Sequence, residues 1–320
     1  MADGGRVKRQ AHVFGLFSAF LRLPVFSCCG FIAVVSVVAA QPVTVTDDRG
    51  KTVTLARPAQ RIVVLAPHLA ELAFAAGAGG RLVGVVRFSD FPPAARDIPL
   101  VGDSARLELE RIAALKPDLV LAWKSGNAPG DVERVESLGY PAFVGETERL
   151  ADIPRLLRSV GAMAGTRPEA ERAAAEFEKE IRALRERFAT ASKVRAFYMI
   201  WRKPLLTVGG THVISDVIAL CGGVNVFAGL RQLTPPVTLE AVIAARPQAI
   251  LGGSDPAGGG TYAAEWRARA PGPLQKLPVF YINPDLIQRP APRIADGARA
   301  VCGALEQVRN SRQSAKAQEK

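Results

Sequence analysis

Short runs of apolar residues alternate with amphipathic stretches along the first half of the chain. The apolar runs are RIVVLA, RLVGVV, DLVLAW and YPAFVG, and stretches such as LAELAFAAGAGG and LELERIAAL lie between them. Continuous Val-, Ile- and Leu-rich runs separated by amphipathic helices are typical of buried parallel strands in βα units. The pattern therefore predicts an α/β lobe over residues 41–165.

A longer helical pattern follows this lobe. Apolar side chains recur three or four positions apart between residues 167 and 189, with charges of both signs at the remaining positions. This spacing predicts one long helix, and we expect the segment 166–191 to connect two lobes. A coiled-coil strip is the alternative, but the pattern is shorter than the several heptads that a coiled coil requires.

The second half repeats the organisation of the first, with VRAFYMIW, QAILGG and PVFYI as expected strands of a lobe over residues 192–308. LELERIAALKPDLVLAW aligns with VTLEAVIAARPQAILGG, which pairs Leu109 with Leu239 and Glu110 with Glu240. The expected fold class is α/β, with two Rossmann-like lobes that contain parallel sheets and are joined by one long helix. Such lobes leave a ligand cleft between them, at the carboxyl ends of their strands.

The two ends of the chain differ from this pattern. The basic residues Arg6, Lys8 and Arg9 precede the apolar run VFSCCGFIAVVSVVAA, so we expect residues 1–40 to be an export signal that is removed near Ala40. A membrane anchor is one alternative, but the run is shorter than the roughly 20 residues that span a bilayer. A lipid anchor at Cys28 or Cys29 is the other alternative. Residues 309–320 are expected to form a basic, flexible tail.

The charge of the chain does not indicate a nucleic-acid partner. The formal net charge is +11, but the Lys and Arg residues are scattered among acids, as on a solvated surface. We expect an exported monomer.

Motifs of the common enzyme classes are missing from the sequence: it contains no Walker A, HExxH or GxSxG pattern. GDSA at residues 102–105 is similar to a hydrolase serine motif, but a serine nucleophile needs a histidine base and an orienting acid. His12 lies in the expected signal, and neither His68 nor His212 has a suitable context. We therefore expect no enzyme, with a secreted α/β hydrolase as the less favoured alternative.

Two cysteines remain once residues 1–40 are removed, Cys221 and Cys302, and they form no CxxC motif. An exported protein with two cysteines suggests one disulfide, which would stabilise the fold by about 4 kcal/mol. Two buried free thiols are the alternative.

The matched glutamates Glu110 and Glu240 each fall in the first turn of an expected helix, where the helix dipole favours a carboxylate. One such glutamate would merely cap its helix. Two at equivalent places in two lobes would form a spaced acidic pair, suited to arginine sockets on a two-fold symmetric partner such as a membrane permease dimer.

Six stretches resemble the helix-backbone family of periplasmic binding proteins: ELAFAAG, FSDFPP, LERIAALKPDLVLAW, CGGVNVF, PQAI and RPAPRI. They occur in order across essentially the whole chain after residue 40, and the resemblance is greatest to the members that bind cobalamin. It implies a periplasmic protein with no cofactor of its own, a corrinoid as bound ligand, and an ABC permease dimer that docks on Glu110 and Glu240. It also implies that Cys221 and Cys302 form the family's disulfide, and that the lobes move little.

The resemblance further assigns residues to the corrinoid cleft: Phe88, Trp123, Asp285 and Arg289, with Trp201 near another aromatic position. A flat macrocycle with amide arms suits aromatic walls and a few hydrogen-bonding groups. The alternatives are core packing for Trp123 and a surface ion pair between Asp285 and Arg289.

Four residues depart from the family pattern. Ser104 and Thr234 stand where the cobalamin-binding members have tryptophans. His68 and His212 are expected in matching loops, and one hypothesis is that either approaches the metal of the ligand, since neutral imidazole binds cobalt and iron. A histidine that is hydrogen-bonded to backbone or water is the alternative. Haem or a ferric siderophore is the second candidate ligand.

Overall fold

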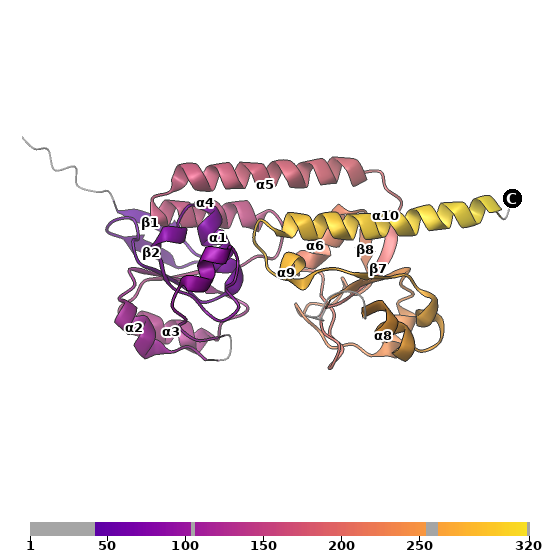
Figure 1. Ribbon diagram of the computed structural model, residues 1–320, viewed down its shortest axis with the longest axis horizontal. Helices are drawn as coiled ribbons and strands as arrows, with labels where there is room; N and C mark the ends of the chain where they lie inside the picture. Colours follow the sequence, from indigo (N-terminus) through magenta and orange to yellow (C-terminus); the bar gives the residue numbers. More distant parts are fainter. Residues whose placement is uncertain (1–41, 104–105, 254–261, 319–320) are drawn as a thin grey trace, which may run out of the picture. The chain divides into compact units, whose positions relative to one another are not determined.

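Two parallel four-stranded sheets organise the computed structural model, which describes residues 42–103, 106–253 and 262–318 (Figure 1). All of these residues belong to one compact unit of the chain, residues 40–320. The expected export signal, its cleavage near Ala40 and Ser104 lie outside the described residues. Within the described ranges, no helix combines the length and apolar character that crossing a membrane requires.

The first lobe begins with an antiparallel hairpin and continues as a parallel sheet in the order β4-β3-β5-β6. Its strands are β1 (Val43–Thr46), β2 (Thr52–Leu55), β3 (Ile62–Val64), β4 (Leu82–Gly84), β5 (Leu119–Trp123) and β6 (Ala142–Gly145). Its helices are α1 (Pro67–Ala75), α2 (Leu109–Leu115), α3 (Pro129–Ser137) and α4 (Asp152–Ala164), with short 3-10 turns at Gly79–Arg81 and Pro93–Asp97. The central strands β3 and β5 are buried on both faces apart from half-buried Trp123, which explains their unbroken apolar sequences.

The second lobe has the sheet order β10-β9-β7-β8, again parallel throughout. Its strands are β7 (Val194–Met199), β8 (Gly223–Asn225), β9 (Ala249–Gly252) and β10 (Val279–Tyr281). Its helices are α6 (Val213–Leu220), α7 (Leu239–Ala244), α8 (Tyr262–Arg269), α9 (Pro284–Ile287) and α10 (Ile294–Gln318), with a 3-10 turn at Gly272–Lys276. The α/β fold class with two parallel sheets is confirmed.

In the sequence, α5 (Arg167–Phe188) connects the last strand of the first sheet, by way of α4, to the first strand of the second sheet. It packs along α4 (Figure 1). Its buried face contains Ala170, Ala174, Phe177, Ile181 and Phe188. The two helices approach so closely that a side chain at Gly161 would place its Cβ 2.2 Å from the Cβ of Ala170. Glycine at this position therefore permits the contact between α4 and α5.

The predicted repeat is visible in the hydrogen bonds that close the C-terminal ends of α2 and α7. The Arg61 guanidinium donates to the carbonyl oxygen of Leu115 at 2.7 Å, and the Arg195 guanidinium donates to that of Ala245 at 2.6 Å. Arg61 directly precedes β3, which pairs with β5, the strand after α2. Arg195 lies at the start of β7, which pairs with β9, the strand after α7. α2 and α7 are therefore equivalent elements of the two lobes.

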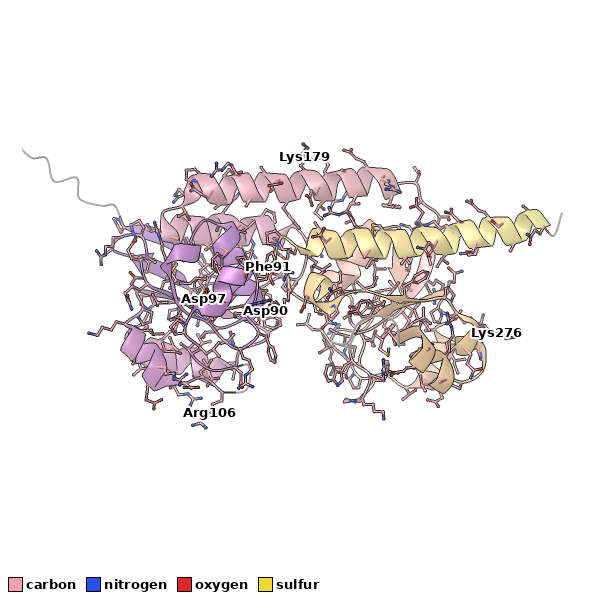
Figure 2. The ribbon with its side chains drawn as sticks, viewed as in Figure 1. Asp90, Phe91, Asp97, Arg106, Lys179 and Lys276 are labelled. Atoms are coloured by element: carbon pink, nitrogen blue, oxygen red, sulfur yellow. A yellow bond between two sulfur atoms is a disulfide. The ribbon has the colours of Figure 1, made fainter. Side chains whose placement is uncertain are left out.

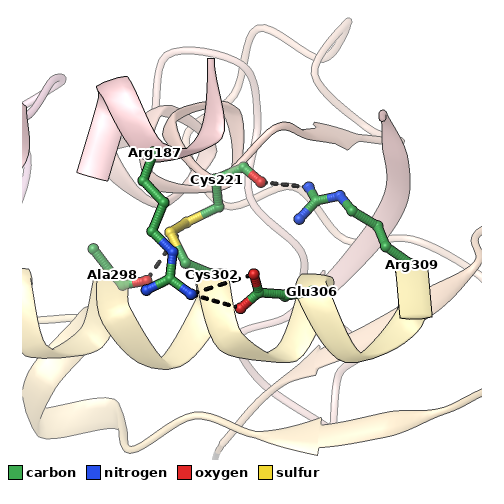
Figure 3. The surroundings of a disulfide bond; sticks show 6 residues. All are labelled: Arg187, Cys221, Ala298, Cys302, Glu306 and Arg309. Carbon is green, nitrogen blue, oxygen red and sulfur yellow. Dashed lines mark hydrogen bonds and ion pairs between the residues drawn. A yellow bond between two sulfur atoms is a disulfide. The ribbon is translucent and has the colours of Figure 1, made fainter. Parts of the chain in front are cut away.

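The disulfide between Cys221 and Cys302 is confirmed, and it joins the end of α6 to α10 (Figure 3). Beside it, Arg187 on α5 forms a 2.9 Å ion pair with Glu306 on α10. α10 continues to Gln318, whereas residues 309–320 were expected to be a flexible tail. The buried Arg309 side chain donates to the carbonyl oxygens of Ser192 (2.8 Å) and Cys221 (2.5 Å), and Arg312 donates to Gln248 (3.0 Å), so the first turn of the expected tail is held against the lobe.

Candidate ligand-binding site

A pocket of about 230 Å³ is lined by residues of both lobes. The first lobe contributes Trp123, Ser125, Glu146 and Thr147, and the second contributes Ile200, His212, Val213, Leu233, Thr234, Gln288 and Pro290. Trp123, Glu146 and Thr147 lie at or just after the carboxyl ends of β5 and β6. This is the edge of a parallel sheet at which α/β proteins bind ligands.

Trp123 is held in place on several sides. Its indole Nε1–H donates to Oε1 of Glu146 at 3.0 Å, and its main-chain N–H donates to Oδ1 of Asn127 at 2.7 Å. The edge of the ring meets the His68 imidazole, with centroids 5.0 Å apart and planes at 84°. An indole fixed in this way offers a flat apolar wall without losing further side-chain freedom when a ligand binds.

His68 does not lie in a loop, as expected, but in the first turn of α1, because the helix begins at Pro67, a residue that favours the first helical position. The side chain is buried. Burial, with a smaller contribution from the positive charge of Arg289, lowers the pKa of His68 to about 3. The imidazole is therefore neutral at physiological pH.

His212 caps the N-terminus of α6, where its Nδ1 accepts a hydrogen bond from the main-chain N–H of Ile214 at 3.1 Å. Because Nδ1 is the acceptor, the proton of the neutral ring belongs on Nε2. Burial lowers the pKa of His212 to about 4. The metal contact proposed for either histidine stays a prediction, and for His212 it would require the capping hydrogen bond or the tautomer to change.

The floor of the pocket has polar groups but no cation among its described lining residues. Glu146 uses Oε1 to accept from both the indole of Trp123 and the main-chain N–H of Thr147 (3.0 Å each). The buried hydroxyl of Thr147 has no hydrogen-bond partner among the described residues. A buried hydroxyl without a partner is energetically costly, so it marks a place where a ligand group would be stabilised.

Arg289 was expected to reach the ligand, and the structure gives it carboxylate partners instead. Its guanidinium lies 3.0 Å from Asp285, 2.5 Å from Asp90 and 3.4 Å from Glu71. The predicted Asp285–Arg289 pair thus forms, but within a larger cluster that includes the first lobe. A role for Asp285 or Arg289 in binding the ligand stays a prediction.

Two further aromatic residues assigned to the cleft are strongly exposed. Phe88 is 69% exposed and Trp201 is 53% exposed, and neither lines the pocket described above. Phe88 has a φ of +68°, a strained conformation for an aromatic residue and one that is often found at functional sites. Thr234, one of the departures from the family pattern, does line the pocket.

Glu110 and Glu240 are both exposed, in the first turns of the equivalent helices α2 and α7. A hydrogen bond from its own main-chain N–H, followed by one from Thr238, lowers the pKa of Glu240. The pair is therefore exposed on two matching elements, one in each lobe, as the repeat predicts.

Sequence reasoning did not single out the residues that join the two lobes or complete the pocket floor: Glu71, Asp90, Arg293, Glu146 and Thr147. A signal was available for the first three. Glu71 and Asp90 are the only charged residues of ELAFAAG and FSDFPP, and Arg293 shares RPAPRI with Arg289. A charge in an otherwise apolar or proline-rich stretch was therefore the signal.

Comparisons with known proteins agree with this architecture. The vitamin B12-binding protein of Vibrio parahaemolyticus is 35% identical over 255 residues, which is 80% of this chain and 92% of that protein. The one from Pectobacterium carotovorum is 35% identical over 259 residues, 80% of this chain and 92% of that protein. The crystal structure of the periplasmic vitamin B12-binding protein of Vibrio cholerae is similar at a TM-score of 0.72 and 34% identity, covering 79% of this chain and 98% of that one.

The family model described as periplasmic binding protein matches residues 62–265, more than half of the chain. This family consists of binding proteins and not of enzymes, in agreement with the missing catalytic motifs. The chain belongs to the periplasmic binding protein family.

Proposed function

We propose that this protein is the solute-binding component of an ABC importer, and that it captures a corrinoid such as cobalamin between its lobes. Relatives at 34–35% identity that match about four fifths of the chain carry the name vitamin B12-binding protein. The pocket of about 230 Å³ would hold only part of a corrinoid, and its Trp123 side chain offers an aromatic wall for the flat macrocycle.

The charge of the pocket is the observation that favours a corrinoid over haem. The corrin ring of cobalamin carries neutral amide arms, and its one anionic group is a phosphodiester in the nucleotide loop, whereas haem carries two propionate carboxylates on the macrocycle itself. The described lining residues include one carboxylate, Glu146, and no Lys or Arg. The nearby Arg289 is already paired with three carboxylates. A second carboxylate would be buried next to Glu146 without a cation, which is costly, while an amide would meet both donors and acceptors.

Delivery of the ligand to the transporter would use the equivalent helices α2 and α7, which do not line the pocket. We assign permease docking to Glu110 and Glu240, because two exposed carboxylates at matching places suit two arginine sockets of a two-fold permease dimer. The export signal over residues 1–40 and its removal near Ala40 belong to the same proposal, which places the protein in the periplasm as a monomer.

Calorimetric titration of the purified protein with cyanocobalamin, cobinamide and haem, each in turn, tests the ligand. Saturable one-to-one binding of cyanocobalamin, with weak or no binding of haem, is the expected result. Saturable binding of haem alone would overturn the corrinoid assignment and leave a transport role intact. Absence of binding to all three would defeat both ligand assignments.

A further inference from the structure

A cluster of charged side chains around the buried Glu71 joins the two lobes beside the pocket. Glu71 on α1 is only 4% exposed, and both of its carboxylate oxygens accept from Arg293, the residue before α10. Nε of Arg293 lies 2.9 Å from Oε2 and Nη2 lies 2.6 Å from Oε1, which is a bidentate pair. Arg289 adds a third, longer contact of 3.4 Å to Glu71.

The same two arginines also hold the loop that follows β4. Nη1 of Arg289 donates to Asp90 at 2.5 Å, and the guanidinium of Arg293 lies 3.7 Å above the ring of Phe91. Figure 2 labels Asp90 and Phe91 on this loop of the first lobe. Residues 289–293 of the second lobe therefore contact both α1 and the loop that carries Phe88.

These contacts continue directly into the pocket walls. Gln288 and Pro290, on either side of Arg289, line the pocket from the second lobe. On the first lobe, His68 lies one helical turn before Glu71 and touches Trp123. The charge cluster therefore connects the two opposite walls of the pocket through a few adjacent residues.

We propose that Glu71 and Arg293 are positioning residues for ligand binding: their bidentate pair, with Arg289 and Asp90, clamps the lobes and fixes the distance between the pocket walls before the ligand arrives. The ligand-binding part of this inference rests on the proposed function. A bidentate pair between a carboxylate and a guanidinium accepts a narrow range of geometries. A buried pair contributes little net stability but penalises arrangements that separate its charges.

The test compares two variants that break the clamp with one matched control. Glu71→Gln removes the charge, and Arg293→Lys keeps the charge but loses the bidentate geometry. Glu180→Gln is the control, because Glu180 forms a 3.0 Å pair with Arg299 on a more exposed surface. Glu71→Met with Arg293→Met covers the case in which Glu71→Gln does not fold, because replacing both partners of a buried pair is usually tolerated.

The first readout is the distribution of distances between spin labels on the two lobes, measured without ligand. Asp97 and Lys276 are exposed positions on the first and second lobe (Figure 2), and labels introduced there as non-natural amino acids spare the disulfide. The wild type and Glu180→Gln are expected to give one narrow distribution that cyanocobalamin leaves unchanged. Glu71→Gln and the double Met variant are expected to broaden it, and Arg293→Lys is expected to broaden it less.

The second readout is the affinity for cyanocobalamin. If only a tenth of the unclamped molecules have the competent lobe spacing, Kd rises roughly tenfold. A narrow, unchanged distance distribution in folded Glu71→Gln would refute the clamp. A broadened distribution in a protein whose wild type does not bind cyanocobalamin would support the clamp and defeat the proposed ligand, so the two failures are distinguishable.

Discussion

Acid is expected to destabilise this protein through His68. The folded state holds the imidazole neutral, because burial and the charge of Arg289 lower the pKa of His68 to about 3. In the unfolded chain the pKa returns to about 6.5. Between these two values the unfolded state binds a proton that the folded state does not, so the free energy of unfolding falls as the pH falls below 6.5.

The size of this effect follows from the shift. Between pH 7.5 and pH 5.5, one histidine that titrates only in the unfolded state lowers the free energy of unfolding by about 1.4 kcal/mol. The stabilisation by neutral His68 is fully present above about pH 7, and its loss is complete only near the folded pKa of about 3.

Urea denaturation of the wild type and of His68→Phe at pH 7.5, 6.5 and 5.5 measures this difference. Phenylalanine keeps an aromatic edge against Trp123 but does not titrate. Any constant cost of the substitution cancels, because only the change with pH is compared. His68→Phe is expected to lose about 1.4 kcal/mol less than the wild type over this range.

A proton NMR titration of the histidine signals checks the cause directly. The signal that is missing in His68→Phe should not shift between pH 8 and pH 5. If that signal titrates near pH 6.5, or if the two proteins have the same pH dependence of unfolding, the burial argument for His68 is wrong.

Three further predictions concern other parts of the molecule. Replacing Cys221 and Cys302 by Ser removes a crosslink between residues 81 positions apart and should lower the free energy of unfolding by about 4.5 kcal/mol relative to the oxidised wild type in urea denaturation, whereas reduced wild type should resemble the variant. Glu110→Ala combined with Glu240→Ala should leave cyanocobalamin binding unchanged but weaken association with the reconstituted permease at least roughly tenfold; lost ligand binding instead would place these residues in the cleft. Thr147→Val removes a buried hydroxyl that has no partner among the described residues. The free energy of unfolding should therefore stay equal or rise, while the affinity for cyanocobalamin falls roughly fivefold. An unchanged affinity would show that the ligand does not use this hydroxyl.

The elements that were predicted from the sequence are those in which the pattern of apolar residues within the element itself reveals which positions are buried. β5 and β9 are apolar throughout because helices cover both faces of a parallel sheet. α5 was visible because its buried residues recur at helical spacing. The disulfide followed from the small number of cysteines and from the family resemblance.

Other elements have weak local signals. α4 includes Pro154 and Gly161, which are unfavourable in most helices, but Pro154 lies in the first turn and Gly161 permits the contact with α5. β8 consists of only three residues, Gly-Val-Asn, and forms because its neighbour β7 supplies the hydrogen bonds.

In the candidate site, too, contacts between residues close in sequence were predicted, and contacts between distant residues were not. Asp285 and Arg289 are four residues apart, so their pairing was visible in the sequence. Arg293 and Glu71 are 222 residues apart, and no periodicity connects them. Tertiary packing alone brings them together, and the same applies to Trp123 and Glu146.

The central claim is that the pocket between the lobes accepts a macrocycle with neutral amide arms. Calorimetry with cyanocobalamin and with its derivatives in which one propionamide arm has been hydrolysed to a carboxylate tests it most directly, since each pair of ligands differs by one charge. At least one of the acids should bind roughly tenfold or more weakly than cyanocobalamin at pH 7.5, because its charge would lie near Glu146 without a cation in the described pocket lining. Equal or tighter binding of every acid would contradict the account.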